Sequence, residues 1–321
     1  MNKLAAKFLR VVISVIVIIA ALFYFFGPID KTSETKVFIV PQNVEGFTVS
    51  TKLKEQNFIR NEWIINLMIS GKTIEPGGYR LQKTMWAWQI ARSVTSKPDL
   101  LWVTIIGCQR REQIGELLAK KLEWNEETLR NWNEAYKSLQ PEYIEGVYYP
   151  DTYLIPRDET GVQVAKRFIN RFNEQFVPYF QKFQDANIRW VTALKIASLI
   201  EREAAGPHDM KLIAGIIWNR LDAGMRLQID ATMQYTKGKK SDGSWWGGID
   251  LTEKTSDSSY NTYLYKGLPP TPICSPSIAA IDSVLNFEET KCLFYLHDSQ
   301  KQIHCAETYE EHKANIEEYL K

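Results

Sequence analysis

One acidic residue, Glu201, occupies a position in a helical pattern where an apolar side chain would be expected. Apolar residues recur at helical spacing from Trp190 onward, and Glu201 follows Leu194 by seven residues and Ala197 by four. Residues at these spacings share one face of an α-helix, so the sequence predicts that Glu201 lies on the buried stripe. Apolar surroundings raise the pKa of a carboxyl group. Glu201 would then keep a proton near neutral pH and act as a general acid.

A structural interpretation of the same residue remains open. Glu201 could lie beyond the end of the helix, near residues 204–207, and simply reach water or pair with Arg226. Carboxylates on an apolar face are often paired with a cation. Spacing alone does not separate this alternative from the general acid.

The remaining composition argues against several kinds of chemistry. The four histidines and four cysteines contain neither HExxH nor CxxC, and Gly-rich phosphate motifs and GxSxG are absent. We therefore expect no metal and no cofactor, and chemistry by carboxylates and neutral polar groups. The net charge is +1, which gives no basic surface for nucleic acid, so no nucleic-acid partner is expected.

The N-terminus predicts a membrane anchor. Lys3, Lys7 and Arg10 accompany an apolar run that ends at Phe26, long enough to cross a bilayer if residues 4–9 join it with their basic neighbours reaching the headgroups. The positive flank predicts a single-pass protein of the cytoplasmic (inner) membrane with its N-terminus inside and everything after Gly27 outside the cytoplasm. A cleaved signal peptide is the alternative, but residues 23–26 offer no small-residue cleavage site.

The elements that position Glu201 belong to a predicted α+β chain. With 321 residues, of which 45% are hydrophobic, the chain can form two domains with separate cores. After the anchor (1–30), residues 36–106 predict a small module of short strands and helices, and residues 107–321 a mostly helical domain with a C-terminal β-hairpin. Strands are expected over 37–40, 79–81, 101–106, 292–296 and 302–306; helices over 47–58, 62–70, 85–94, 126–136, 162–183 and 210–223, and from 110, 190 and 308.

Two irregular stretches and two cysteines leave alternatives open. Residues 145–153 mix turn formers, aromatics and acids, and could form a surface loop or the wall of a cleft. Trp245 and Trp246 could stack on sugar rings or simply pack. Cys292 and Cys305 lie near opposite each other in the predicted hairpin, so they could form a disulfide outside the cytoplasm or remain buried thiols.

Six short motifs, taken in order, resemble the membrane-anchored endolytic murein transglycosylases of the YceG-like type over nearly the whole chain. The motifs are Glu145-Gly146 with Pro150-Asp151-Thr152-Tyr153; Ala197-Ser198-Leu199-Ile200-Glu201-Arg202-Glu203; Asn219-Arg220-Leu221 with Gly224-Met225-Arg226-Leu227-Gln228 and Asp230; Tyr260-Asn261-Thr262-Tyr263; Gly267-Leu268-Pro269-Pro270; and Pro272-Ile273. The resemblance implies that module 36–106 is LysM-like and that 107–321 is the catalytic domain. One departure is clear: the family's Thr-Ile-Pro-Glu-Gly segment is Thr104-Ile105-Ile106-Gly107-Cys108 here.

The resemblance implies that Glu201 is the catalytic residue, the same residue that the helical pattern selects. We expect it to protonate the leaving oxygen between N-acetylmuramic acid and N-acetylglucosamine, and then to accept the proton of the muramic C6 hydroxyl. Gln228, Tyr260 and Asn261 are expected to position the sugars, with Asp230, Glu145 and Glu203 as less certain supports.

Two other functions remain open from the sequence. A peptidoglycan hydrolase would need a second carboxylate, for which Asp230 and Glu145 are the candidates. A non-catalytic wall-binding scaffold would use the LysM-like module alone. The resemblance also implies nascent peptidoglycan glycan strands as substrate, and penicillin-binding proteins of the synthesis machinery as partners.

Overall fold

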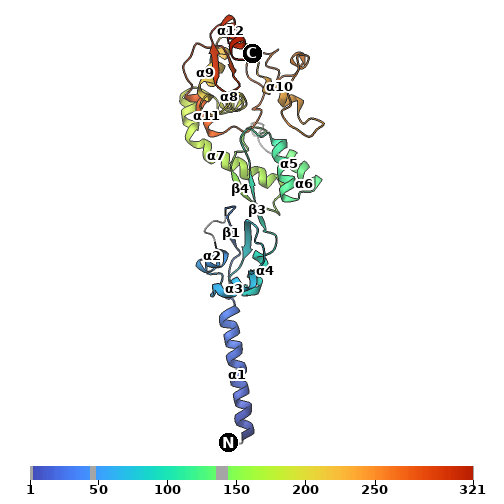
Figure 1. Ribbon diagram of the computed structural model, residues 1–321, viewed down its shortest axis with the longest axis vertical. Helices are drawn as coiled ribbons and strands as arrows, with labels where there is room; N and C mark the ends of the chain where they lie inside the picture. Colours follow the sequence, from blue (N-terminus) through green and yellow to red (C-terminus); the bar gives the residue numbers. More distant parts are fainter. Residues whose placement is uncertain (1–2, 44–47, 135–143, 321) are drawn as a thin grey trace. The chain divides into compact units, whose positions relative to one another are not determined.

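The computed structural model describes residues 3–43, 48–134 and 144–320 (Figure 1). The chain forms two compact units, of which the first comprises residues 1–103 with 153–158 and the second comprises 104–152 with 159–321. Position 47 of one predicted helix and positions 135–136 of another lie outside the described residues.

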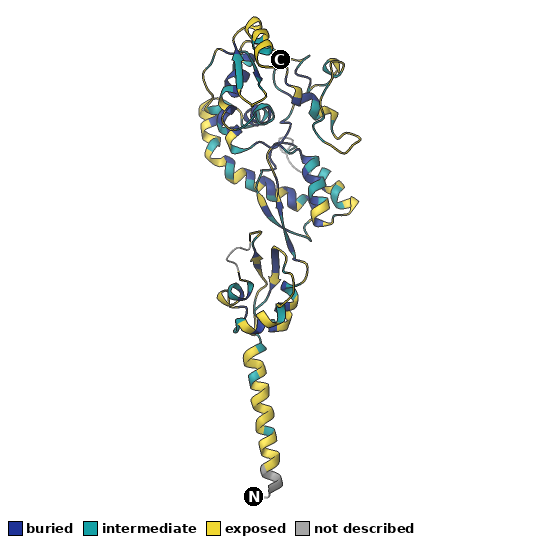
Figure 2. Cartoon of the chain, viewed as in Figure 1, coloured by how far each residue is buried: buried dark blue, intermediate teal, exposed yellow. Residues whose placement is uncertain are grey.

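The first unit begins with the apolar helix α1 (Lys3–Phe26). Its segment Lys7–Phe26 has a mean hydropathy of 2.7, with none of its apolar window buried. Figure 2 shows most of the described part of the helix as exposed. A helix of this length and composition can cross a bilayer. A signal sequence has the same two properties.

In its described residues, the rest of the first unit is a four-stranded sheet with three short helices. The sheet has the order β1 (Lys36–Val40), β2 (Gly77–Leu81), β3 (Leu100–Thr104) and β4 (Thr152–Pro156), and both β1–β2 and β2–β3 are antiparallel. The helices are α2 (Val49–Glu55), α3 (Glu62–Ile69) and α4 (Ala87–Val94). Alternate strand residues and one face of each helix supply the core, which includes Phe38, Leu53, Ile65, Tyr79 and Ile90, all at most 1% exposed.

The second unit is mainly helical. Its helices are α5 (Arg111–Leu122), α6 (Glu126–Glu134), α7 (Gly161–Asp185), α8 (Trp190–Glu203), α9 (Met210–Asp222), α10 (Asp230–Lys237), α11 (Ile278–Leu285) and α12 (Tyr309–Tyr319), with the hairpin β5 (Phe294–His297) and β6 (Ile303–Ala306). Helix α8 is central, because it contacts α7, α9, α10 and α11. The apolar face of α8 is fully buried at Leu194, Ala197 and Ile200.

The structure confirms the mixed α+β class, the apolar N-terminal helix and the C-terminal hairpin. Among the described residues it adds four elements that the sequence did not predict, which are β4, α10, α11 and the short 3₁₀-helix η3 (Glu253–Thr255). Strand β4 begins inside the stretch 145–153, so the last residues of that stretch belong to a sheet.

All four cysteines form disulfides, Cys108 with Cys274 and Cys292 with Cys305. The possibility of a bridge across the hairpin is therefore confirmed, and the alternative of buried free thiols is wrong. The Cys108–Cys274 bridge was not predicted, since its partners are 166 residues apart in the sequence.

Candidate active site at the end of helix α8

Glu201 lies inside the last turn of α8. The three residues before it, Ser198, Leu199 and Ile200, are fully buried, while Glu201 itself is half-buried. It is therefore at the boundary between the core and the surface, not beyond the helix end. No ion pair of Glu201 with Arg226, or with any other cation, occurs among the residues that the structure describes.

Ser277 holds one oxygen of the Glu201 carboxylate. Its hydroxyl donates to Oε2 at 2.6 Å and its backbone N–H donates to the same atom at 3.1 Å. Ser277 is also the N-cap of α11, because its hydroxyl oxygen accepts from the Ala280 N–H at 3.3 Å. The carboxylate thus faces the N-terminus of a helix, where the backbone dipoles favour negative charge.

The other oxygen of Glu201, Oε1, lies against Gly107. A Cβ atom at position 107 would come within 2.8 Å of Oε1, closer than van der Waals contact allows. Oε1 has no hydrogen-bond partner among the described residues. The glycine therefore keeps the space beside Oε1 clear of protein side chains.

The segments that contact the two oxygens are joined covalently. The Cys108–Cys274 disulfide connects the residue after Gly107 to a residue three positions before Ser277. Two backbone hydrogen bonds reinforce it, from Cys108 N to Ser275 O at 2.9 Å and from Ser275 N to Gln109 O at 3.1 Å. The segments on the two sides of the carboxylate are thus cross-linked to each other.

Four of the predicted binding residues lie on two loops that pair with each other. Gln228 and Asp230 precede and begin α10, and Tyr260 and Asn261 lie just before Thr262. Thr262 joins the loops, since its carbonyl accepts from Gln228 N at 3.0 Å and its hydroxyl accepts from Ile229 N at 3.0 Å. The structure therefore brings Gln228, Asp230, Tyr260 and Asn261 together.

Within this pair of loops, the side chains differ in how free they are. Asn261 is fully buried, and its amide donates to Lys254 O and Ser256 O while accepting from Tyr263 N. Gln228 is exposed and has a left-handed backbone with φ of 53°, a conformation that costs energy in a residue other than glycine.

Tyr260 is half-buried beside another tyrosine. Its hydroxyl shares a hydrogen bond of 2.7 Å with the Thr271 hydroxyl, and its ring lies 5.0 Å from that of Tyr235. Burial raises the pKa of Tyr260, so this phenol stays protonated and can both donate and accept.

Asp230 and Glu203 both accept hydrogen bonds from tyrosine hydroxyls. Asp230 accepts from the Tyr263 hydroxyl and forms an ion pair of 3.3 Å with Lys254. Glu203 accepts from the Tyr295 hydroxyl at 2.6 Å. Burial raises the pKa of Glu203, and the Tyr295 hydrogen bond opposes part of this rise.

Glu145 is part of the protein interior. It is 1% exposed, and both of its oxygens accept from the N–H of Arg111, the first residue of α5, at 3.2 Å. Burial raises the pKa of Glu145 to about 8, and the nearby Glu112 carboxylate adds to the rise. Glu145 therefore caps α5.

Trp245 and Trp246 are packed by polar and cationic neighbours. Their indole N–H groups donate to Glu116 and Gln113 of α5. Arg110 lies over the Trp245 ring at 5.0 Å and Arg202 over the Trp246 ring at 4.3 Å. These contacts favour the packing interpretation of the tryptophan pair.

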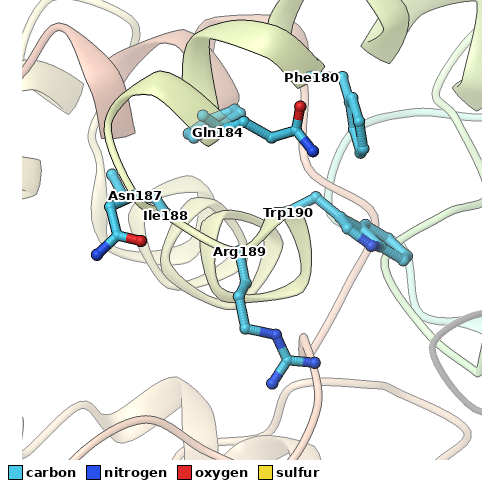
Figure 3. Close-up of a pocket in the computed structure, with 7 residues that line it drawn as sticks. Phe180, Gln184, Asn187, Ile188, Arg189 and Trp190 are labelled. Atoms are coloured by element: carbon cyan, nitrogen blue, oxygen red, sulfur yellow. The ribbon is translucent and has the colours of Figure 1, made fainter.

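A cavity of about 400 Å³ lies at the opposite end of α8 from Glu201. It is lined by Phe180, Phe183, Gln184, Asn187, Ile188, Arg189 and Trp190 (Figure 3). At 1.5 Å per residue along the helix, Trp190 is about 16 Å from Glu201. This cavity is therefore separate from the carboxylate.

Sequence reasoning missed Ser277 and Gly107, the two residues that define the surroundings of Glu201. A signal for Ser277 was present, since a serine directly before Ile278-Ala279-Ala280-Ile281 is a typical N-cap. Gly107 was noticed only as a departure from a motif. Nothing in the sequence placed it beside a residue 94 positions away.

Sequence comparisons match the chain to one protein family and to proteins of two bacteria. A model of the YceG-like family matches residues 38–318. The endolytic murein transglycosylase of Bacillus subtilis (strain 168) is 26% identical over 319 residues, covering 91% of this chain and 87% of that protein. The endolytic murein transglycosylase of Streptococcus pneumoniae serotype 2 (strain D39 / NCTC 7466) is 26% identical over 335 residues, but the match spans only 60% of its length.

A solved structure shares the fold. The crystal structure of a YceG-like protein from Listeria monocytogenes superposes with a TM-score of 0.62 at 23% sequence identity, covering 88% of this chain and 98% of that one.

Proposed function

The chain belongs to the YceG-like family, and we propose that it is an endolytic lytic transglycosylase that cleaves peptidoglycan glycan strands between N-acetylmuramic acid and N-acetylglucosamine. The names of its relatives support the reaction class. The observation that carries the proposal for this chain is the setting of Glu201. One of its oxygens is held by Ser277, and the other lies beside Gly107 with no hydrogen-bond partner in the described part of the chain.

This setting fits a carboxyl group that gives and then takes one proton. Two donors occupy Oε2, so in this proposal the transferred proton leaves from Oε1. Glu201 protonates the glycosidic oxygen, the bond from that oxygen to muramic C1 breaks, and N-acetylglucosamine leaves with a hydroxyl group. The Glu201 carboxylate then removes the proton of the muramic C6 hydroxyl while the C6 oxygen attacks C1. The product is a 1,6-anhydro end, no water is consumed, and Glu201 is protonated again.

The predicted binding residues divide into two groups within this proposal. Gln228 and Tyr260 contact the sugars, because their polar atoms are exposed or half-buried on the paired loops. Asn261, Asp230, Glu203 and Glu145 hold those loops and helices in place through the contacts described above. Preorganised neutral groups of this kind can stabilise charge that develops on the sugar.

A non-catalytic wall-binding scaffold is the second candidate, and one observation favours it. The departure at Gly107 falls on the site itself, where the motif of the family has a glutamate and this chain has no side chain. If the missing glutamate is indispensable, the protein binds glycan strands without cutting them.

Mass spectrometry of purified glycan strands incubated with the full-length chain tests these functions. We expect internal fragments with 1,6-anhydro ends from the wild type, none from Glu201→Gln, and wild-type yields from Glu127→Gln, a matched change at an exposed residue of α6. Reducing ends would identify a hydrolase. Intact strands that bind wild type and Glu201→Gln equally would identify a scaffold.

We further propose that α1 anchors the chain in the cytoplasmic membrane with the N-terminus inside, and that residues 36–106 form a LysM-like module. Lys3, Lys7 and Arg10 support this orientation. The two disulfides support it as well, because such bonds persist in oxidising compartments outside the cytoplasm. Penicillin-binding proteins are proposed as partners on the resemblance alone, and in-cell crosslinking tests for them.

A further inference from the structure

Large apolar side chains are exposed on one part of the first unit. Trp63 is 59% exposed and Leu67 is 73% exposed, and they lie four residues apart on the same side of α3. Trp88 of α4 is 50% exposed. The Trp88 ring lies 4.6 Å from the Trp86 ring, and Met68 lines the same cavity as both. We call these five residues the tryptophan face. Contiguous apolar surfaces on a folded domain usually mark a contact site.

The tryptophan face adjoins the last turns of α1. The Trp86 ring lies 4.9 Å from the Phe23 ring, and the Trp63 ring lies 6.1 Å from the Phe25 ring. A cavity of about 500 Å³ lies between the two elements, lined by Ile19, Leu22, Phe23 and Phe26 of α1 and by Met68, Trp86 and Trp88 of the face.

The connection between α1 and the rest of the unit is short and fixed by hydrogen bonds. The Arg60 guanidinium donates to the carbonyls of Gly27 and Pro28 at 2.9 and 2.8 Å, directly after the helix ends. The N–H groups of Ile29 and Asp30 both donate to Lys83 O. Phe26 packs against the core of the module. The face is therefore fixed beside the end of α1.

The position of the tryptophan face along α1 determines how deep the face would lie in a bilayer. Phe23 lies about 4.5 Å before Phe26 along the helix axis, and Phe26 is the last residue of the apolar segment. A ring that contacts Phe23 therefore lies at the level of the final turn of the membrane span, where hydrocarbon meets headgroups.

The chemistry of the face suits that level. Indole rings concentrate at membrane interfaces because they combine an apolar body with one N–H donor. No acceptor for the indole N–H of Trp63, Trp86 or Trp88 occurs among the described residues, so these donors remain available to lipid headgroups. Cavities lined only by apolar side chains are filled by acyl chains more readily than by water.

We propose that the tryptophan face lies in the interfacial layer of the bilayer, so that the part of the first unit after α1 rests on the membrane instead of standing away from it on a linker. This inference rests on the proposed membrane span and is independent of the proposed enzymatic activity. A glycan strand is the competing occupant, since exposed tryptophans also stack on sugars. Contact with the end of α1 favours lipid.

The first test measures tryptophan fluorescence of the full-length chain in lipid nanodiscs with and without bromine in the upper acyl chains. Bromine quenches only nearby indoles. We expect quenching of the wild type, at least a halving of the quenched fraction in Trp63→Tyr/Trp88→Tyr, and no decrease in Trp102→Tyr, a control in the same unit whose indole donates to Val40 O. An unquenched wild type, or equal quenching in the double variant, overturns the proposal.

A second test avoids removing tryptophans. A spin label at Leu67→Cys should be more accessible to oxygen than to a water-soluble nickel chelate, and a label at Ile39→Cys, which is 44% exposed on β1, should show the reverse. Equal chelate access at both sites overturns the proposal, as does protection of position 67 by added glycan strands without lipid.

Alkaline washing of membranes distinguishes a chain without a membrane span from a chain that has the span but no interfacial tryptophan face. A chain that is washed out lacks the span itself, and the face then has no bilayer to contact. A chain that is retained but shows neither quenching nor oxygen preference has the span and not the interfacial face.

Discussion

Ser277 donates two hydrogen bonds to the same oxygen of Glu201, one from its hydroxyl and one from its backbone, across 76 positions of sequence. Because Ser277 also begins α11, the orientation of the candidate acid and the start of a core helix depend on one side chain. A carboxyl group that must transfer a proton in two directions needs a fixed orientation. This dual role makes Ser277 a positioning residue whose loss can be measured.

Ser277→Ala should lower kcat for anhydro-end formation by about 10- to 100-fold, since a hydrogen bond to a charged group contributes roughly 1.5–3 kcal/mol. The backbone donor remains, so activity should not vanish. KM should change little, because the Ser277 hydroxyl is already engaged by Glu201 and by the Ala280 N–H.

Loss of the N-cap alone should cost about 1 kcal/mol of stability, and Thr308→Ala provides the control for it. Thr308 caps α12 in the same way, but its loss should leave kcat unchanged. Restoration of kcat by Ser277→Thr would support positioning, whereas equal activity losses in Ser277→Ala and Thr308→Ala would indicate a stability effect only.

Gly107→Ala should reduce activity at least 10-fold with little change in melting temperature. The added Cβ would lie 2.8 Å from Oε1 of Glu201, so the carboxylate must shift from the orientation that Ser277 holds. Gly248→Ala is the matched control, because a Cβ there meets nothing within 4 Å. Unchanged kinetics in Gly107→Ala would mean that Glu201 has room to shift and that its geometry is not critical.

Glu201 could be identified from the sequence, whereas its contact with Ser277 could not. The helical periodicity of α8 predicts that Glu201 shares the apolar face with Leu194 and Ala197, because periodicity is a local property that burial imposes on the chain. The structure places Glu201 half-buried at the edge of that face. The contact with Ser277 depends on how α11 packs against α8, and packing between distant segments leaves no local pattern. An N-cap serine could still have indicated where α11 begins.

Strand β4 and Asn261 illustrate the same limit. The turn formers and acids around Pro150 conceal β4, a strand of only five residues in which Tyr153 and Ile155 are buried. Asn261 belongs to a motif that suggested a sugar contact, yet its amide closes hydrogen bonds with the loop around it. A motif identifies a polar residue, but only the fold decides whether its atoms are free.

The two disulfides should differ in their contribution to stability. In the chain-entropy treatment the effect grows with the length of the closed loop. The separations of 166 and 13 residues correspond to about 5 and about 3 kcal/mol. Cys108→Ser/Cys274→Ser should therefore lower the melting temperature more than Cys292→Ser/Cys305→Ser does.

The same pair of variants tests the site. Only the first bridge joins the segments on either side of Glu201, so only its loss should reduce kcat under conditions where both variants remain folded. Equal activity in the two variants would show that the backbone hydrogen bonds between residues 108–109 and 275 suffice to hold the site.

The pH dependence of stability should reflect Glu145. Burial raises the pKa of Glu145 to about 8 from its ordinary value of 4.5, so the folded protein binds a proton there that the unfolded chain releases. Stability is then fully present below about pH 4.5 and is lost as the pH rises through 8. Glu145→Gln stays neutral and lacks this loss. At about 1.4 kcal/mol per pKa unit, the wild type should lose roughly 3 kcal/mol relative to the variant between pH 5 and pH 8.

Denaturation of the full-length chain at pH 5, 6.5 and 8 measures this difference, with the exposed Glu127→Gln as a control that should run parallel to the wild type. The Arg111 N–H and the guanidinium groups of Arg110 and Arg111 oppose the effect of burial, because they favour the ionised carboxylate. If Glu145→Gln instead loses stability relative to the wild type as the pH rises, these donors outweigh burial, and Glu145 caps α5 as an anion. That outcome would give the acid of the Glu145-Gly146 motif an electrostatic role at the start of α5.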